Sequence, residues 1–295
     1  MARAAFAPAK VNLFLHVGAP QDGFHPICSL MVFADIGDRV STFDAGSLAL
    51  RVAGPFARDL TAEHDNLVLR AARTLIAEAR RPVAPIGLSL EKLLPVASGL
   101  GGGSSDAGAT MRLLRETLEL PIDNDRLEAL AASLGADGAA CLWGAPAMAQ
   151  GRGERLSSAP GLPPLAAVLV NPRVAVATAE VYRRFDVEGR FSDVVPPAAP
   201  DAFEDAIDLA AWLAVQRNDL EAPAVALAPA VGTVLETLAA EPETLLARVS
   251  GSGGTCFALC VSDIEAESLA ERLEAMAPGW WVRRCRLGGP WPDPE

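Results

Sequence analysis

A glycine-rich string near the middle of the chain carries the clearest chemical signal. It reads Pro95, Val96, Ala97, Ser98, Gly99, Leu100, Gly101, Gly102, Gly103, Ser104, Ser105. Glycines let a backbone approach a ligand closely, successive N–H groups can point at one anion, and a helix N-terminus adds partial positive charge. The spacing fits neither a P-loop nor a dinucleotide-binding turn. A phosphate-binding loop and a flexible turn with a serine helix cap both remain open, and a strand before the string with a helix after it favours phosphate binding.

Three other features bear residue types that could act beside such a loop. A second glycine string runs from Ser250 to Thr255, so a nucleotide or phosphorylated substrate could be held between the two. The chain has only two lysines, Lys10 and Lys92, and an ammonium group is not interchangeable with a guanidinium. Lys92, just before the glycine string, could approach a nucleotide or lie on the surface.

The elements that must position these residues follow from apolar periodicity. Alternation predicts a half-buried strand over 11–17 and a second strand over 86–90 that leads into the glycine string. Helices are expected over 67–79 (capped by Asp65), 104–120, 126–134 (ending at Gly135) and 266–276, with strands over 165–170, 256–261 and 281–287. Residues 186–208 are rich in Pro, Asp and Ala and predict a surface insertion or linker. The strand–helix–strand end indicates an α+β fold.

Composition narrows the classes of function. The 295 residues are 51% hydrophobic and carry a formal net charge of −12, with no run of basic residues. We therefore expect no nucleic-acid partner, because a phosphate-backbone binder needs a basic face. No stretch is apolar and long enough for a membrane span, so a cytoplasmic protein without a membrane partner is expected. Five scattered cysteines predict buried free thiols.

Ordered short motifs along most of the chain resemble the GHMP kinases, the family of galacto-, homoserine and mevalonate kinases. The glycine string resembles the phosphate loop of that family. The further motifs are Ala7-Pro-Ala-Lys10-Val-Asn12-Leu, Asp22-Gly-Phe-His25, Asp65-Asn-Leu-Val-Leu-Arg70-Ala, Leu134-Gly-Ala-Asp137, Gly151-Arg-Gly-Glu154, Asn171-Pro, Thr178-Ala-Glu, Asn218-Asp-Leu-Glu221 and Ser250-Gly-Ser-Gly. As a set they are most similar to the branch of the family that acts on 4-diphosphocytidyl-2-C-methyl-D-erythritol.

The resemblance implies a two-lobe α+β fold. Residues 1–155 would form an ATP-binding lobe similar to the second domain of ribosomal protein S5, and residues 156–295 a ferredoxin-like lobe that closes the substrate cleft. It implies transfer of the ATP γ-phosphate, with Mg²⁺, to the 2-hydroxyl of that cytidine diphosphate alcohol, in the methylerythritol phosphate route to isoprenoids. A monomer or weak homodimer is expected.

The same resemblance implies roles for individual residues. Asp137 would be the catalytic base and Lys10 its partner cation, while 95–105 would bind ATP and the Ser105 hydroxyl would contact Mg²⁺. The substrate-binding residues would be Asn12, Phe24, His25, Thr178 and Tyr182. His25 would read the cytosine edge, and the base would lie between the rings of Phe24 and Tyr182.

The sequence departs from the family pattern at one place, and two other functions remain as alternatives. Where the family commonly has Val-Pro after the Gly-Ala-Asp of Asp137, this chain has Gly138 and Ala139, so a rigid turn beside the base is missing. A related kinase could act on another alcohol, such as homoserine or mevalonate, but the string from Asp22 to His25 argues against that. A catalytically silent nucleotide-binding relative is the other rival, and retention of both Lys10 and Asp137 argues against it.

Overall fold

The structure is a computed structural model that describes residues 3–60, 66–79, 81–191 and 193–293. A mixed sheet runs through it, in the order β3-β4-β2-β10-β7-β9-β8, with β1 and β5 also paired to β2 and β6 paired to β5. The strands are β1 (Ala4–Val17), β2 (Ile27–Phe43), β3 (Ala49–Ala53), β4 (Gly87–Glu91), β5 (Ala147–Gly151), β6 (Arg155–Ser158), β7 (Leu165–Asn171), β8 (Thr244–Val249), β9 (Cys256–Cys260) and β10 (Trp281–Gly288).

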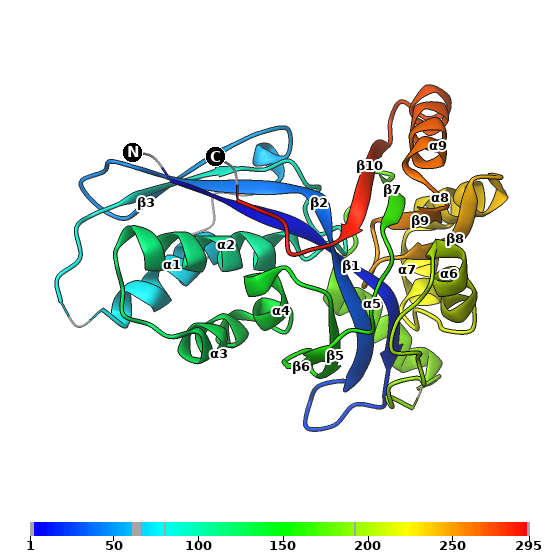
Figure 1. Cartoon of the computed structure of the whole chain (residues 1–295), viewed down its shortest axis with the longest axis horizontal. Coiled ribbons are helices and arrows are strands. Elements are labelled where there is room, and N and C mark those ends of the chain that lie inside the picture. The colour runs from blue at the N-terminus through cyan, green and yellow to red at the C-terminus, as the bar shows by residue number, and fades with distance from the viewer. Residues whose placement is uncertain (1–2, 61–65, 80, 192, 294–295) are drawn as a thin grey trace.

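The helices form two groups along this sheet, as Figure 1 shows: α1 to α4 lie beside the N-terminal strands, and α5 to α9 lie around β7 to β10. They are α1 (Leu67–Ala77), α2 (Gly102–Thr117), α3 (Asn124–Leu134), α4 (Gly138–Trp143), α5 (Thr178–Glu188), α6 (Ala206–Ala214), α7 (Glu221–Leu227), α8 (Pro229–Ala240) and α9 (Asp263–Met276), with a short 3₁₀ turn over Ala57–Asp59. The arrangement is the α+β class that the sequence predicts.

Strands β1 and β2 form a long antiparallel pair with two irregularities. The register shifts between Pro8 and Lys10 and again between Asn12 and Phe14. A shift of this kind changes the direction in which neighbouring side chains point. The two shifts enclose Lys10 and Asn12, and both side chains line the cavity described below.

The strand predicted over 11–17 is confirmed as part of β1, and the same irregularity explains why it is fully buried and not half-buried. Every residue from Val11 to Val17 is buried. Val11 and Leu13 pack into one apolar cluster, whereas Leu15 and Val17 pack into another. Since the shift after Asn12 interrupts the simple alternation, β1 is covered on both faces.

Helix α2 begins within the glycine string, two residues before the predicted start. Its N-cap residue, Gly101, has a left-handed backbone with φ of 62°. Met111 and Leu114 are fully buried, and the helix packs against β1, β2, α1 and α4. The N-terminus of a long, well-packed helix is therefore fixed at Gly102.

The strand–helix–strand unit predicted at the C-terminal end is confirmed. Strands β9 and β10 both pair antiparallel with β7, so they run parallel to each other, and α9 connects them. The sheet extends from there to β2 through only two paired positions, Leu287 with Ala34 and Gly288 with Phe33.

Most other predicted elements occur with small shifts at their ends. The side chain of Asn66 caps α1 by accepting from the Val68 amide at 2.9 Å, whereas Asp65 lies outside the described residues. Helix α3 ends at Leu134 with Gly135 as its C-cap, as predicted. The predicted linker is shorter than expected, because Asp186 belongs to α5 and Asp208 to α6, and Phe203 within it is buried.

The C-terminal segment returns to the first strands, and Figure 1 shows the segment after β10 passing over the half of the molecule that contains β1 and β2. The Trp291 indole donates to the Phe33 carbonyl at 2.9 Å, and the Asp293 carboxylate accepts from the Phe6 amide at 2.8 Å.

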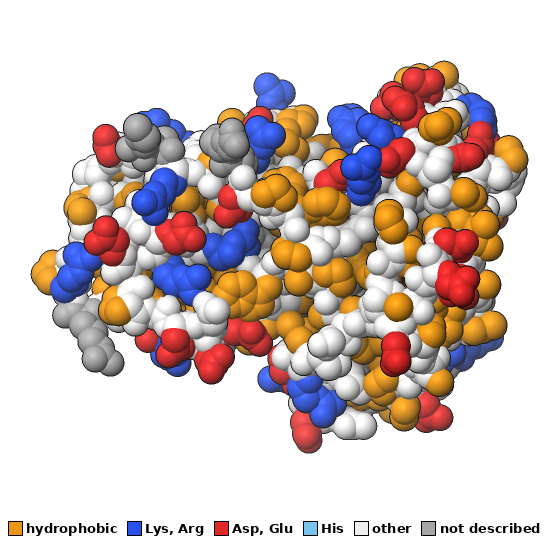
Figure 2. Space-filling model, viewed as in Figure 1, with side chains coloured by type: hydrophobic (Ala, Val, Ile, Leu, Met, Phe, Trp, Pro, Cys, Tyr) orange, Lys and Arg blue, Asp and Glu red, His pale blue; other side chains and the backbone are white. Residues whose placement is uncertain are grey.

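Acidic and basic side chains are intermixed on the face shown in Figure 2. All five cysteines are free and buried, as predicted. No helix in the described part of the chain has both the length and the apolar character to span a bilayer.

Candidate active site

A cavity of about 540 Å³ lies where the two glycine strings meet β1 and the start of α4. The predicted site residues that line it are Lys10, Asn12, Pro95, Val96, Ala97, Ser98, Gly99, Gly101, Gly102, Gly103, Ser104, Asp137, Thr178 and Tyr182. The remaining predicted residues, Leu100, Ser105, Phe24 and His25, do not line it. The structure therefore gathers most of the predicted site into one cavity.

Lys10 and Asp137 face each other across this cavity, from β1 and from the start of α4. The Lys10 ammonium lies 3.3 Å from Asp137 Oδ2 and donates to Asn12 Oδ1 at 2.7 Å. Asn12 in turn donates to the Ser29 hydroxyl at 2.7 Å. Lys10 is 4% exposed, so its stem is packed while its charged end reaches a carboxylate that solvent and ligand can also reach. This pair has the form of a carboxylate base with a neighbouring cation.

Two helix ends hold Asp137 in place. Helix α3 ends at Leu134, and Asp137 is the N-cap residue of α4, with a side chain that makes no capping hydrogen bond. A Cβ atom on Gly138 would overlap the Ala131 carbonyl oxygen of α3. The glycine that replaces the usual valine therefore lets α4 pack directly against α3, and this contact fixes the turn beside Asp137.

The second glycine string supports the first. Gly99 has φ of 76°, and a Cβ atom there would overlap the Ser250 carbonyl oxygen. The Ser250 hydroxyl donates to the Gly99 carbonyl at 3.0 Å, and the Thr255 amide donates to the Ser98 carbonyl at 2.9 Å. Both strings thus need glycine because their backbones touch.

The start of α2 supplies free donors to the cavity. Gly102, Gly103 and Ser104 form its first turn, where backbone N–H groups have no acceptor within the helix. All three residues line the cavity. Together with the helix dipole, these amides can bind a phosphate group.

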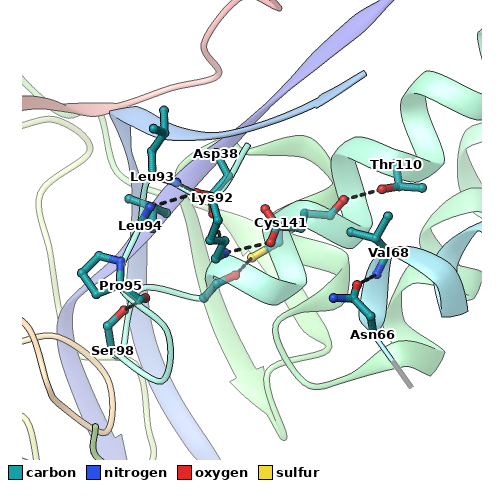
Figure 3. A network of polar contacts seen from close by, with 12 residues as sticks. Asp38, Asn66, Val68, Lys92, Leu93, Leu94, Pro95, Ser98, Thr110 and Cys141 are labelled. Atoms are coloured by element: carbon teal, nitrogen blue, oxygen red, sulfur yellow. Dashed lines mark hydrogen bonds and ion pairs between the residues drawn. The ribbon is translucent and has the colours of Figure 1, made fainter. Parts of the chain in front are cut away.

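Lys92 is neither a surface residue nor free, and Figure 3 shows its ammonium group between carboxylates. Its Nζ lies 2.5 Å from Asp38 Oδ2 and 2.8 Å from Asp106 Oδ2, and the residue is 2% exposed. The other oxygen of Asp38 accepts from the Leu93 and Leu94 amides at 2.6 and 2.9 Å. This network connects β2, the end of β4 and the first turns of α2 directly behind Gly102.

Asp106 is the unusual member of this network. Burial raises the pKa of its carboxyl to about 7, and Asp38 adds to the rise while Lys92 opposes it. For Lys92, burial lowers the pKa, but Asp106 and Asp38 outweigh burial and the net shift is upward. Asp106 Oδ1 is buried without a hydrogen-bond partner among the described residues. The glycine string thus rests on a network with one ammonium group and two carboxyl groups.

The expected nucleobase site is partly occupied by the protein itself. The rings of His25 and Tyr182 lie 5.1 Å apart, and the phenol of Tyr182 lines the cavity. His25 Nδ1 is 2.9 Å from the Gly18 carbonyl oxygen, and Nε2 is 3.0 Å from Asp186 Oδ1. Both ring nitrogens of His25 therefore have partners, and reading a cytosine edge with this side chain would require Asp186 to move.

Phe24 lies outside the cavity lining and is 54% exposed. The guanidinium of Arg152 stacks over its ring at 4.7 Å from the centroid. Stacking of a cytosine between Phe24 and Tyr182 therefore stays a prediction. Thr178 lies one turn before Tyr182 on α5, and its hydroxyl pairs with the Ser252 hydroxyl at 2.8 Å, which connects α5 to the second glycine string.

The cavity also brings together residues whose roles the sequence does not predict. Arg152 and Asp106 line it, and Ser250 holds the glycine string, although no role is predicted for any of them. Asn218 donates to the Val249 and Gly251 carbonyls at 2.8 Å each, and so fixes the second string. The motifs containing Arg152 and Asn218 were visible in the sequence, but neither motif alone says what its side chain contacts.

The thiol of Cys141 and the phenol of Tyr182 near the reacting pair remain neutral near pH 7. Burial raises the pKa of the Cys141 thiol to about 12, and nearby Asp137 adds to that rise. Burial, with a further contribution from Asp137, also raises the pKa of Tyr182 to about 12. Neither a thiolate nor a phenolate therefore competes with Asp137 as a base.

Comparison with known proteins gives the cavity a family context. The chain matches the family model "GHMP kinases N terminal domain" over residues 66–145 and the model "GHMP kinases C terminal" over residues 199–279. A relative from Caulobacter sp. (strain K31), named 4-diphosphocytidyl-2-C-methyl-D-erythritol kinase, is 60% identical over 288 residues, which are 97% of this chain and 98% of the relative. A relative of the same name from Cereibacter sphaeroides (strain ATCC 17025 / ATH 2.4.3) is 47% identical and covers 97% of this chain and 99% of its own length.

Solved structures agree with these relatives. A crystal structure of 4-(cytidine 5'-diphospho)-2C-methyl-D-erythritol kinase matches with a TM-score of 0.77 and 34% identity, covering 98% of this chain and all of the other. A homoserine kinase from Cytophaga hutchinsonii ATCC 33406 has a TM-score of 0.70 at 19% identity, covering 97% and 95%, and shows the same fold.

Proposed function

The chain belongs to the GHMP kinase family, and from that premise we propose that it transfers the γ-phosphate of ATP to the 2-hydroxyl of 4-diphosphocytidyl-2-C-methyl-D-erythritol. A small-molecule kinase of this family uses ATP as its phosphoryl donor. The relatives named for that alcohol are similar over nearly the whole chain, which supports the choice of substrate. The pair of Lys10 and Asp137, 3.3 Å apart beside the glycine string, is the observation that carries the proposal.

The geometry assigns a separate task to each part of the site. Asp137 Oδ2 would accept the proton of the attacking hydroxyl, since its carboxylate is exposed to the cavity and makes no capping bond. Lys10 would hold this carboxylate in place and offset the negative charge that develops during transfer. The first-turn amides of α2 would bind the ATP phosphates. Phosphoryl transfer needs little more than such positioning and charge stabilisation.

The residues present also fit Mg²⁺, the metal that the resemblance implies. Magnesium prefers hard oxygen ligands and takes several of them from phosphate and water. Asp106 Oδ1 and Ser105 Oγ are buried oxygens without a hydrogen-bond partner among the described residues, and Asp106 lines the cavity. Asp106 would therefore hold the ion, which would neutralise phosphate charge when bound, whereas the contact of the Ser105 hydroxyl, which does not line the cavity, stays an expectation from the sequence. No group of three or more His, Cys, Asp or Glu side chains suited to a metal occurs in the described part of the chain.

For the alcohol substrate, we propose that Asn12, Thr178 and Tyr182 bind from the cavity wall, while Phe24 and His25 contribute at its edge. Asn12 is already aligned through Ser29 and Lys10. The family-model boundaries are compatible with a division into lobes near residue 155, which stays a prediction. A cytoplasmic location, a monomeric or weakly dimeric state and the absence of nucleic-acid binding likewise stay predictions from the sequence.

Coupled ADP release with ATP, Mg²⁺ and 4-diphosphocytidyl-2-C-methyl-D-erythritol tests the proposal. We expect turnover of this alcohol, and a fall in kcat of about 10²- to 10⁴-fold for Asp137→Asn with ATP affinity retained, because general-base catalysis contributes about that much. Asp125→Asn, an exposed carboxylate on α3, is the matched control and should leave kcat unchanged.

Homoserine and mevalonate serve as control alcohols in the same assay. Turnover of either one instead of the cytidine diphosphate alcohol would preserve the kinase chemistry but contradict the proposed substrate. ATP binding without turnover of any alcohol would identify a silent relative. An Asp137→Asn variant as active as wild type would remove Asp137 from the mechanism.

A further inference from the structure

Arg152 is the cation in the cavity that remains available for a ligand. The cationic residues among the described lining are Lys10, Lys92 and Arg152. Lys10 lies against Asp137, and Lys92 lies between two carboxyl groups. Within the described ranges, no carboxylate lies within ion-pair distance of the Arg152 guanidinium. Arg152 therefore has a charge that the protein does not already neutralise.

The backbone of Arg152 is held in a tight turn between β5 and β6. Gly151 and Gly153 on either side have φ of 70° and 117°. The Arg152 amide donates to Glu154 Oε2 at 2.6 Å. The guanidinium lies over the Phe24 ring, 4.7 Å from its centroid. An aromatic ring supports one face of the planar guanidinium and leaves its N–H edge free for an anion.

The turn places Arg152 between the two ends of the expected substrate. On one side, Gly153 packs against Ala136, since a Cβ atom on Gly153 would lie 2.9 Å from the Ala136 carbonyl oxygen, and Asp137 is the next residue. On the other side, Phe24 precedes His25, whose ring packs on Tyr182. Arg152 thus lies between the reacting pair and the aromatic residues at which the nucleobase is expected.

We propose that Arg152 binds the diphosphate of the alcohol substrate and so selects for a nucleoside diphosphate ester. This inference rests on the proposed function, in which a diphosphate connects the cytidine to the reacting alcohol. A guanidinium fits phosphate oxygens with two parallel hydrogen bonds, which an ammonium group cannot do. The carboxylates of Asp59, Asp106 and Asp137 also line the cavity, so a diphosphate entering it needs a cation of its own.

Steady-state kinetics of Arg152→Gln test this assignment, with Arg155→Gln as the matched control. Arg155 is an exposed arginine at the start of β6 that does not line the cavity, so both variants remove one positive charge from the same hairpin. For Arg152→Gln we expect the KM for the cytidine diphosphate alcohol to rise about ten- to hundredfold, as for loss of a charged hydrogen bond, with the KM for ATP and the kcat near wild type. Arg155→Gln should match wild type throughout.

Two competitive ligands separate diphosphate binding from support of the nucleobase site. Cytidine diphosphate should bind Arg152→Gln about ten- to hundredfold more weakly than wild type, whereas cytidine should bind both equally. Equal weakening of both ligands would show that Arg152 acts through Phe24 and would overturn the proposal. A raised KM for ATP would place the guanidinium at the ATP phosphates and would also overturn it.

The failure of the proposed function is distinguishable from the failure of this inference. A wild-type chain that does not turn over the cytidine diphosphate alcohol contradicts the function and, with it, the diphosphate assignment. A wild-type chain that does turn it over, with Arg152→Gln indistinguishable from Arg155→Gln, contradicts the Arg152 assignment alone.

Discussion

The interior position of Lys92 depends on the two carboxyl groups around its ammonium. An unpaired lysine would be costly to bury, and here Asp38 and Asp106 contact the charged group at 2.5 and 2.8 Å. Burying two carboxyl groups beside one ammonium leaves an excess of negative charge, however. The effect falls on Asp106. Burial, with a smaller contribution from Asp38, raises the pKa of its carboxyl to about 7.

This shift predicts how the stability of the folded chain depends on pH. An aspartate in the unfolded chain loses its proton near pH 4. Between about pH 4 and 7 the folded state thus keeps a proton that the unfolded state has lost, so the contribution of Asp106 to the free energy of unfolding falls as pH rises and levels above about 7. In Asp106→Asn this contribution is absent. We expect the stability of wild type relative to Asp106→Asn to decrease from pH 5 to pH 8 in urea unfolding.

Asp125→Asn is the control, because it removes an exposed carboxylate. It shows how much the loss of any single carboxylate changes the pH dependence of the free energy of unfolding. A constant difference between wild type and Asp106→Asn across the pH range would mean that Asp106 is ionised throughout. It would then contribute a second full negative charge behind the glycine string.

At the scale of elements, the contact between α3 and α4 decides where the base lies. Gly138 follows Asp137 directly and lies against the Ala131 carbonyl without room for a methyl group. Helix α4 is only six residues long, so its position depends on this packing more than on its own helix propensity. The missing Val-Pro turn is thus replaced by a close contact of two helices.

We therefore expect Gly138→Ala to lower stability by about 1–3 kcal/mol, as overpacking in a filled interior does, and to lower kcat by moving Asp137.

Gly135→Ala is the matched control. Nothing lies within 4 Å of a Cβ atom there, and its φ of 166° is extended backbone. It should change the free energy of unfolding by less than about 0.5 kcal/mol. Thermal unfolding and ADP release measure both quantities. Equal behaviour of the two variants would contradict the role of the α3–α4 contact.

The local sequence pattern predicts some parts of the fold and of the site but not others. Glycine spacing and flanking apolar periodicity reveal the glycine string, because a phosphate loop is defined by local backbone freedom. Strand β2 is not predicted, since its residues are buried from Ile27 to Ala34 without the alternation that marks a strand. The burial of Lys92 is equally invisible locally, because Asp38 lies 54 residues away along the chain.

The same limit applies to the aromatic residues of the site. The resemblance supplies Phe24, His25 and Tyr182 as one group, yet their positions depend on contacts between distant segments. Asp186 of α5 pairs with His25, and Arg152 of the β5–β6 turn covers Phe24. The positions of Lys10 and Asp137, which the resemblance also supplies, depend more on local structure, because Lys10 lies at an irregularity of β1 and Asp137 at the start of α4.

At the scale of the whole molecule, the sheet is continuous between the regions of the two family models. It runs from β3 through β2, β10 and β7 to β8, and the cavity takes lining from both sides of residue 155. Contacts such as that between Gly99 and Ser250 further join the two regions. A molecule connected in this way should unfold as one unit even if it comprises two lobes.

We accordingly expect one thermal transition. Trp143 lies in the N-terminal region, whereas Trp212, Trp280, Trp281 and Trp291 lie in the C-terminal region. Far-ultraviolet circular dichroism and tryptophan fluorescence of wild type should give the same midpoint, and fluorescence of a Trp143→Phe variant should follow circular dichroism of that same variant. Two separated midpoints would show that the regions unfold independently.

The junction between β2 and β10 also has a consequence for synthesis on the ribosome. Ala34 and Phe33 in the middle of β2 pair with Leu287 and Gly288, which are translated after every other strand described here. Because the chain emerges N-terminus first, the backbone groups at this point of β2 stay unpaired with β10 until almost all of the chain has been translated. Unpaired strand edges readily pair with other chains. The nascent polypeptide therefore exposes backbone groups of β2 to pairing with other chains that the finished sheet covers.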